Sequence, residues 1–182
     1  MKHVHYQIGK YNIHTFDDVF LLSERQNFYM FFSGSMFKLG WGDSVEVHEQ
    51  HKKFLHSNYS ADDVSNSNFF TTIQNKQAPV LHDLLNNRKL GSAVVNLSTP
   101  SNSYQAHSHG DGLSLLYYVN LRWQEEWAGE TLFFSEDLKD VVFTSPYTPG
   151  RIILFDNPIP HSIRAQSMAG PQYRFTFASF LE

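Results

Sequence analysis

The segment AHSHGDGLSLLYYVN, residues 106–120, places two histidines and an aspartate directly before a long apolar run. Residues i and i+2 of a strand point to the same face, so His109 and Asp111 are expected to project together. An imidazole beside a carboxylate makes two thirds of the 2-His-1-carboxylate set that holds Fe(II) and leaves coordination positions open. A His-x-Asp pattern arises easily by chance in a chain with ten histidines, so the metal site needs a third ligand.

A third ligand is offered by His161, which follows a turn rich in Pro and Asn in the segment TPGRIILFDNPIPHSIRAQ. Several strand-like segments separate it from Asp111, which is enough chain to cross a small β sandwich and return. The next strand-like segment, PQYRFTFASFL, carries Arg174 among aromatic residues. A guanidinium in an apolar strand is costly unless a carboxylate meets it, and an organic acid held through a bidentate salt bridge would meet this need.

Two neighbouring residues are alternatives for these roles. His107 shares a strand face with His109, so it is a competing metal ligand, although a supporting contact or a contact to substrate is the favoured interpretation. Arg164 lies on the segment that begins at His161 and is an alternative partner for the acid.

The elements that position these residues are mostly β. From about residue 91 the chain contains short segments that are rich in β-branched and aromatic residues and are separated by turn residues. Seven such segments in half the chain predict a sandwich or a barrel. They are GSAVVNLS, LSLLYYVNL, ETLFF, DVVFTS, RIILFD, HSIRAQ and YRFTFASFL.

The first 90 residues mix strand-like pieces, KHVHYQIG and FYMFFSGSMFKLGW, with helical ones. One helix is predicted from Asp43 or Ser44, as capping residues, to about Leu55. A second is predicted from Pro79 in its first turn, with a stop near Gly91. We expect these helices to cover one face of the β core. The motif HEQH lacks the i, i+4 spacing of zinc proteases, so three histidines are interpreted as solvated helix positions, namely His48, His51 and His56.

Length and composition set limits on this protein. A chain of 182 residues predicts one domain, residues 1–182, with a real core. The net charge of −4 and the lack of a basic run argue against a nucleic acid or anionic membrane partner. The absence of cysteine excludes disulfides and thiolate ligands. A start without an apolar signal core and the lack of a membrane-length run predict a cytoplasmic location. No pattern indicates the oligomeric state.

The second half of the chain resembles the Fe(II)- and 2-oxoglutarate-dependent dioxygenases, particularly their prolyl 4-hydroxylase-like branch. The matching pieces occur in order and at spacings similar to those of the family. They are HGD, LSLLYYVN directly after it, WAGETLFF against the family's Gly-Gly-Glu-Thr, PGRIILFDNPIPH and GPQYRFTFASF. The resemblance implies a mostly β fold with flanking helices, in which residues 91–182 form a double-stranded β-helix (jelly-roll) core and residues 1–90 supply the helices and supporting strands.

The same resemblance implies the site residues. His109, Asp111 and His161 would be the iron ligands, and Arg174 would bind the distal carboxylate of 2-oxoglutarate. The branch often places a Tyr ahead of His-x-Asp to hydrogen-bond the cosubstrate, and the candidates for that contact here are Asn96, Ser98 and Tyr104.

Four further residues stand out near these motifs. Ala128 replaces the first Gly of the Gly-Gly pair. Trp123 and Trp127 either pack over the barrel mouth or form a wall for substrate. Asn120 either bonds backbone near the metal strand or ends its own strand.

The implied activity is hydroxylation of a C–H bond, with O2 and 2-oxoglutarate consumed and succinate released. The substrate is a peptidyl residue, an amino acid or a small metabolite. A carboxylate at Asp111 favours hydroxylation over halogenation, because related halogenases have a small residue there. The alternative is a cupin-like metal-binding protein or isomerase that does not use 2-oxoglutarate. Arg174 discriminates, because without a cosubstrate it has no reason to point inward.

Overall fold

The computed structural model describes residues 1–41, 54–100, 102 and 104–182. The helices are α1 (Leu22–Ser33), α3 (Ala61–Asn66), α4 (Phe69–Gln74), α5 (Pro79–Leu85) and the 3-10 helix η1 (Glu125–Trp127). The strands are β1 (Lys2–Ile8), β2 (Tyr11–Asp17), β3 (Lys38–Trp41), β4 (Phe54–Tyr59), β5 (Leu90–Ser98), β6 (Leu113–Tyr118), β7 (Thr131–Phe134), β8 (Val141–Ser145), β9 (Ile152–Asp156), β10 (His161–Ile163) and β11 (Arg174–Leu181).

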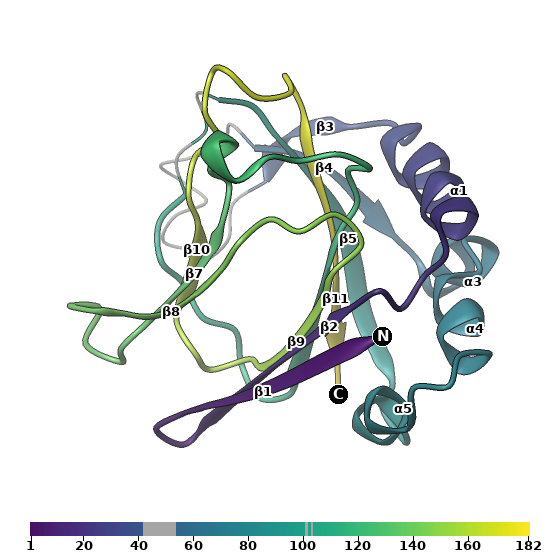
Figure 1. Cartoon of the computed structure of the whole chain (residues 1–182), viewed down its shortest axis with the longest axis horizontal. Helices are drawn as coiled ribbons and strands as arrows, with labels where there is room; N and C mark the ends of the chain where they lie inside the picture. The colour runs from purple at the N-terminus through teal and green to yellow at the C-terminus, as the bar shows by residue number, and fades with distance from the viewer. Residues whose placement is uncertain (42–53, 101, 103) are drawn as a thin grey trace.

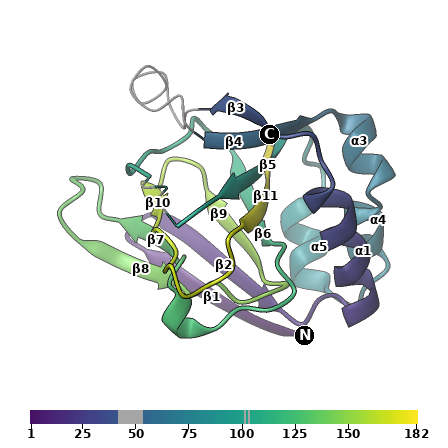
Figure 2. The same cartoon turned by 90° about the horizontal axis from the view of Figure 1, so that it is seen from above.

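The strands form two antiparallel sheets that face each other. The large sheet has eight strands in the order β1-β2-β9-β6-β11-β5-β4-β3, and the small sheet has three in the order β10-β7-β8. Figure 1 shows the small sheet on one side of the large one and the helices on the other. Figure 2 shows the hairpins β1–β2 and β3–β4 at opposite ends of the large sheet. This is the jelly-roll architecture expected from the sequence.

The large sheet is buried on both faces, which explains the unbroken apolar run LSLLYY of β6. Leu115 and Tyr117 pack with the core of the helices, whereas Leu116 and Tyr118 pack in the core between the sheets. Successive strand residues point to opposite faces, so both faces need apolar or satisfied polar side chains. The same alternation turns Phe175 and Phe177 of β11 toward the helices. Thr176, which lies between them, therefore points into the interior between the two sheets.

Helix α1 corrects one prediction, because residues 28–33 of the strand-like piece FYMFFSGSMFKLGW are helical and KLGW alone is a strand. Phe28 and Phe32 lie one turn apart and are both buried, so helical spacing puts them on one face. The Glu24 carboxylate accepts the Leu21 N–H at 2.8 Å, which helps to satisfy the start of the helix. Tertiary packing outweighs the β propensity of the aromatic residues.

The prediction of a helix from 43 to about Leu55 lies mostly outside the described residues, as do His48 and His51. Its end is wrong, because Phe54–Tyr59 form β4, which pairs with β3 and β5. His56 is consequently a buried strand residue, not a solvated helix position. The pairing of Leu55 with Leu97 adds β4 to the large sheet. At Leu55, sheet pairing therefore outweighs the helical pattern of the sequence.

Other local predictions are confirmed. Each of the seven β segments predicted after residue 91 contains a strand. Pro79 is the first residue of α5, but this helix ends at Leu85 and Gly91 already belongs to β5. No helix among the described residues is long and apolar enough to cross a membrane.

The N-terminal hairpin is tied to the second half of the chain. The Arg151 guanidinium donates to both carboxylate oxygens of Asp17, at 2.6 and 2.8 Å, in a bidentate geometry that gives the strongest such pairs. The backbone and side chain of Asn12 donate to Asp156 at 2.7 and 3.1 Å. The two halves of the chain therefore build one sheet.

Candidate active site

Three histidines converge at the edge of the interior between the two sheets. Their ligand nitrogens, one each from His107, His109 and His161, all lie within 4.8 Å of one another. The ring centroids are 4.5 Å apart for His107 and His161, and 5.1 Å apart for each of the other two pairs. Within the described parts of the chain, this is the one group of three or more such side chains that could hold a metal ion.

Backbone pairing sets the positions of these rings. His107 and His161 form an antiparallel bridge that joins the segment before β6 to β10. The N–H of His109 donates to the carbonyl of Asn157 at 2.9 Å, which holds the second histidine of the His-x-His pair against the end of β9. His107 and His109 share a face, as the strand alternation predicts.

Asp111 is placed differently from the expectation. Its side chain is exposed and does not belong to the histidine group. The chain bends over residues 110–112, with Gly112 at a φ of +116°, so the alternation that would align His109 with Asp111 is broken. Asp111 lines a surface hollow of about 290 Å³ together with His109 and Glu182, but it does not line the interior cavity that all three histidines share. The structure therefore brings His107, not Asp111, to His109 and His161.

Burial keeps His109 and His161 in the neutral form, which is the form that binds metals. Desolvation, with a smaller effect of His107, lowers the pKa of His109 to about 4. Desolvation also holds the pKa of His161 well below its usual value, with His107 adding to the effect. Nδ1 of His161 donates to the carbonyl of Ile159 at 3.0 Å, and Nδ1 of His107 donates to that of Gln105 at 3.2 Å. These bonds fix both tautomers with the lone pair on Nε2.

Apolar side chains surround the group. The Phe155 ring lies 4.8 Å from the His161 ring, and the Phe180 ring lies 4.6 Å from that of His109. The cavity is also lined by Val94, Leu116, Ile163 and Ala178. Such walls exclude water and strengthen electrostatic interactions inside the site.

Arg174 begins β11 and is 1% exposed. Its Nε donates to the carbonyl of Gly129 at 3.0 Å. Its Cζ lies 4.7 Å from the ring centroid of Tyr147 and 5.6 Å from that of Tyr118. Nη1 and Nη2 are buried without a hydrogen-bond partner among the residues that the structure describes. A buried guanidinium with two unmatched donors is costly, so the geometry fits an anionic ligand that reaches it.

Two further buried polar atoms lie on the interior side of the sheet. Thr176 Oγ1 and Asn96 Oδ1 belong to residues paired across β11 and β5, and neither atom has a partner in the described chain. Asn96 was a candidate from the sequence, whereas Thr176 was missed. The sequence feature that could have identified Thr176 is its position two residues after Arg174, because residues i and i+2 of a strand point to the same face.

The other two candidates from the sequence have different surroundings. Ser98 Oγ lies 3.5 Å from Gln166 Oε1 and 3.4 Å from the carbonyl of Arg174. Tyr104 lines the same cavity as Asn96 and the three histidines. Ser98 is therefore engaged beside Arg174, and Tyr104 is a wall of the cavity.

Arg164 does not take the place of Arg174. Its side chain is largely exposed, and its Nη1 lies 3.7 Å from a carboxylate oxygen of Glu130. Asn120 bonds the start of β11 instead of the histidine-bearing segment, since its amide accepts from Phe175 N–H at 2.8 Å and donates to the carbonyl of Tyr173 at 3.0 Å. Trp123 packs on Tyr147 at 4.3 Å.

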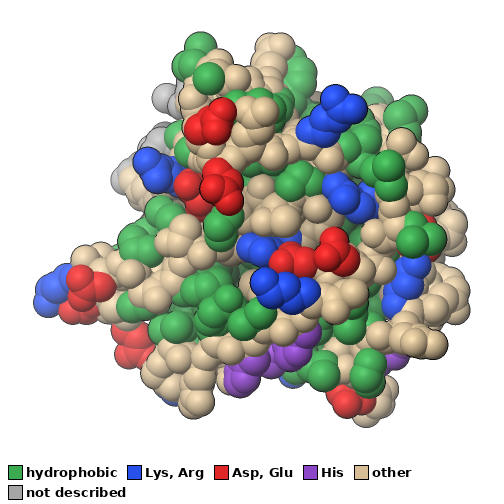
Figure 3. Space-filling model, in the orientation of Figure 1, with side chains coloured by type: hydrophobic (Ala, Val, Ile, Leu, Met, Phe, Trp, Pro, Cys, Tyr) green, Lys and Arg blue, Asp and Glu red, His purple; other side chains and the backbone are tan. Residues whose placement is uncertain are grey.

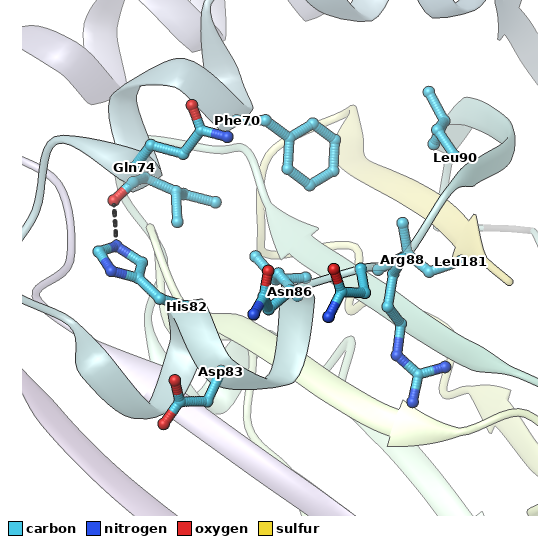
Figure 4. Close-up of a pocket in the computed structure, with 11 residues that line it drawn as sticks. Phe70, Gln74, His82, Asp83, Asn86, Arg88, Leu90 and Leu181 are labelled. Atoms are coloured by element: carbon cyan, nitrogen blue, oxygen red, sulfur yellow. Dashed lines mark hydrogen bonds between the residues drawn. The ribbon is translucent and has the colours of Figure 1, made fainter.

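A separate hollow of about 460 Å³ lies among α4, α5 and the segment that leads into β5. Figure 4 shows His82 hydrogen-bonded across this hollow, with Arg88 at its rim. Its Nε2 donates to the carbonyl of Ile73 at 2.9 Å. None of the three clustered histidines lines this hollow, so it is distinct from the candidate active site.

The three imidazoles of His107, His109 and His161 indicate which metals this site could bind. Three imidazoles suit iron, zinc, copper or nickel, whereas magnesium, calcium and manganese prefer carboxylate oxygens. The residues therefore fit a transition metal, but they depart from the 2-His-1-carboxylate set because the position two after the first histidine is His109. The two unmatched Nη atoms of Arg174 fit a carboxylate.

The comparisons with known proteins concern the fold. No family model matches the chain, and no curated protein matches its sequence. A prolyl-4-hydroxylase from Pseudomonas putida is 15% identical over 93% of this chain and 92% of that one, with a TM-score of 0.59. A prolyl hydroxylase from Trichoplax adhaerens, solved with a hypoxia inducible factor peptide fragment, is 12% identical over 93% and 82%, with a TM-score of 0.64.

A third solved structure has a higher TM-score. An oxidoreductase of the 2OG-Fe(II) oxygenase family from Burkholderia pseudomallei is 8% identical over 93% of this chain and 84% of that one, with a TM-score of 0.70. The resemblance seen in the sequence is thus confirmed for the architecture. The chain has the jelly-roll fold of the 2OG-Fe(II) oxygenases, in the form found in prolyl 4-hydroxylases.

Proposed function

We propose that this protein is an Fe(II)- and 2-oxoglutarate-dependent oxygenase that hydroxylates a C–H bond. The observation that carries the proposal is the buried Arg174 guanidinium, whose two Nη atoms have no partner among the described residues. It lies on the interior side of β11, two residues before Thr176, which pairs with Asn96, and Asn96 lines the same cavity as the three histidines. A ligand with a carboxylate at one end and a metal-binding group at the other would satisfy both ends of this interior.

The proposed metal ligands are His107, His109 and His161, with Asp111 outside the set. Three neutral imidazoles leave the full charge of a divalent metal uncompensated, and a dianionic cosubstrate would balance it. The Nδ1–H bonds to backbone carbonyls hold two of the rings in the tautomer that offers Nε2. When bound, the metal, 2-oxoglutarate and O2 supply the oxidant, such that one oxygen atom enters the substrate and the other enters succinate as CO2 is lost.

The remaining residues bind and orient. Arg174 would hold the distal carboxylate through Nη1 and Nη2, and Thr176 Oγ1 would donate to the same ligand. Asn96 would donate to it through its amide nitrogen Nδ2. The apolar walls around the histidines would keep water from the reacting atoms.

The proposed substrate is a peptidyl residue, an amino acid or a small metabolite. The Trichoplax adhaerens neighbour was solved with a peptide, which supports including peptides among the candidates. With His109 in the place expected for Asp111, a carboxylate ligand does not distinguish hydroxylation from halogenation. Hydroxylation is favoured instead because all three side-chain ligands are present, so no position is vacated for a halide.

A second candidate is a cupin-like metal protein that does not use 2-oxoglutarate. The three-histidine set favours it, because three histidines also form the catalytic zinc site of some enzymes that do not use 2-oxoglutarate. The unmatched guanidinium favours the oxygenase. The two candidates differ in whether a dicarboxylate binds.

Anaerobic titration with Fe(II) and then 2-oxoglutarate tests both candidates. The oxygenase predicts a weak visible charge-transfer band that His109→Ala abolishes and Asp111→Ala preserves. Arg174→Ala should weaken 2-oxoglutarate binding by about tenfold or more while sparing the metal. Tight binding of Zn(II) with no response to 2-oxoglutarate would favour the cupin-like protein. Succinate formation with a panel of peptides and amino acids then addresses the substrate.

A further inference from the structure

The Arg174 guanidinium is held by aromatic rings and by a hydrogen bond at Nε, whereas Nη1 and Nη2 have no partner among the described residues. We infer that Tyr147 is a positioning residue that fixes the plane of the Arg174 guanidinium, so that Nη1 and Nη2 meet a carboxylate edge-on. This inference rests on the proposed function, because it concerns how the cosubstrate is recognised.

Stacked rings form a wall against the guanidinium. The Tyr147 and Tyr118 rings are 4.3 Å apart with an interplanar angle of 18°, and both lie within cation–π range of the Arg174 Cζ. Tyr147 is the nearer of the two, at 4.7 Å. A ring face attracts a planar cation and restricts it to orientations in which one edge remains for hydrogen bonding.

The Tyr147 ring is itself fixed to the strand that carries Arg174. Its hydroxyl lies 2.6 Å from the carbonyl of Phe175 and 2.7 Å from Asn120 Oδ1. It also accepts the N–H of Asn120 at 3.0 Å. Tyr147 is 4% exposed. The ring therefore moves with the start of β11, and its distance from the guanidinium is set by three polar contacts.

The third restraint comes from the turn after η1. Gly129 accepts from Arg174 Nε at 3.0 Å, and a Cβ at Gly129 would lie 3.2 Å from that same Nε. Trp123 packs on Tyr147 at 4.3 Å and donates through Nε1 to the carbonyl of Ala128 at 2.8 Å. The guanidinium is held at its face and at Nε, and only the Nη edge remains.

A guanidinium that is already held in one orientation should bind a carboxylate more tightly than a free one. An arginine side chain loses rotamer freedom when it forms a bidentate pair, and a site that has already lost this freedom binds more tightly. The preference for a dicarboxylate over a monocarboxylate should therefore depend on Tyr147. The bond between the metal and the 2-oxo acid end should not depend on it.

The experiment compares two ligands that differ only at the distal end. Binding of 2-oxoglutarate and of 2-oxovalerate to the Fe(II)-loaded protein is measured anaerobically for the wild type, Tyr147→Phe and Tyr147→Leu. We expect Tyr147→Leu to weaken 2-oxoglutarate binding by about tenfold and 2-oxovalerate binding by less than about twofold. Tyr147→Phe keeps the ring face but loses the hydroxyl contacts that place it, so its loss of 2-oxoglutarate affinity should be smaller than that of Tyr147→Leu, and its 2-oxovalerate affinity should change by less than about twofold. Metal affinity should be unchanged.

The outcomes separate the two proposals. A wild type that does not prefer 2-oxoglutarate over 2-oxovalerate overturns the proposed function, and this inference with it. A wild type with that preference and a Tyr147→Leu variant that retains it overturn the inference alone. Equal losses for both ligands indicate a merely structural role and also overturn it. If Tyr147→Leu does not fold, Trp123→Leu removes the packing behind the ring, and it should reduce the same preference by about threefold; an unchanged preference there contradicts the inference.

Discussion

His107 and His161 are joined by two backbone hydrogen bonds, in which each N–H donates to the carbonyl of the other residue, at 3.0 and 2.8 Å. Two of the three candidate ligands are thus placed by main-chain pairing between segments far apart in the sequence. Sites built on paired backbone are held more closely than sites on free loops. His109 lacks such a pair of bonds, so its position depends on the contacts around residues 110–112.

Asn157 provides those contacts. Its side chain accepts from Ser114 Oγ at 2.6 Å and donates to the carbonyl of Asp111 at 3.1 Å. We expect Asn157→Ala to lower metal affinity by about tenfold, because outer partners that orient ligands carry effects of this size. Competition with a chromophoric chelator measures the change. Asn27→Ala, on the exposed side of α1, is the matched control, and equal affinities in the two variants would contradict this role.

Ala128 occupies a backbone conformation that suits glycine. Its φ is 54° and its ψ is −145°, a region in which an L side chain costs about 1–3 kcal/mol. Ala128→Gly should therefore raise the free energy of unfolding by about 1 kcal/mol, as measured by urea denaturation. Asn87 also has a positive φ, of 60°, but asparagine tolerates this region, so Asn87→Gly should change stability by less than about 0.5 kcal/mol. A destabilised Ala128→Gly would contradict the argument.

The pair between Arg151 and Asp17 is largely buried, with side-chain exposures of 15% and 18%. Removing one partner leaves the other charge buried and unpaired, so Arg151→Ala should lose about 3 kcal/mol of stability. The exposed pair of Lys139 and Asp137, at 78% and 55%, is the comparison. Lys139→Ala should cost less than about 0.5 kcal/mol. Chemical denaturation of both variants checks the difference, and similar losses would refute it.

Histidines also gather on the surface over the β1–β2 hairpin (Figure 3), where the His14 ring stacks at 4.3 Å on that of His5 and at 5.4 Å on that of His3. Burial, with smaller effects of His5 and His3, lowers the pKa of His14 from 6.5 to about 4. The unfolded chain therefore takes up a proton at higher pH than the folded chain. This contribution to stability is complete above pH 6.5 and is lost as the pH falls toward about 4.

The measurement is the free energy of unfolding of the wild type and His14→Gln between pH 7.5 and pH 4. Because His14 is only partly buried, we expect the wild type to lose about 1 kcal/mol more than the variant over this range. Parallel stability curves would show that His14 does not contribute.

Much of this architecture could be predicted from the sequence because the strands are short segments rich in β-branched and aromatic residues, separated by turn residues. The cost of a guanidinium in an aromatic strand singled out Arg174, and the turn before His161 marked a ligand at the start of a strand. Strand alternation predicts Asp111 beside His109, but the segment bends over residues 110–112, so alternation does not hold there. Such a bend depends on backbone packing that spacing alone does not encode.

The strand-like reading of α1 failed for a related reason. Aromatic residues favour strands on average, but the burial of Phe28 and Phe32 on one face depends on the sheet beneath them. Thr176 was missed because an unmatched hydroxyl is recognised only when its surroundings are known. Local patterns therefore identified the strands, whereas the choice between neighbouring polar residues required the tertiary structure.

The order of the large sheet bears on how the protein can be divided. The hairpin β1–β2 borders β9, and the hairpin β3–β4 borders β5, so both neighbours of the C-terminal strands come from the first 60 residues. A fragment beginning near residue 91 would leave two long rows of main-chain amides and carbonyls bare. Exposed edge strands of this kind pair with other chains and lead to aggregation. The first third of the chain thus covers the two sheet edges that would otherwise promote aggregation of the half that carries the histidines.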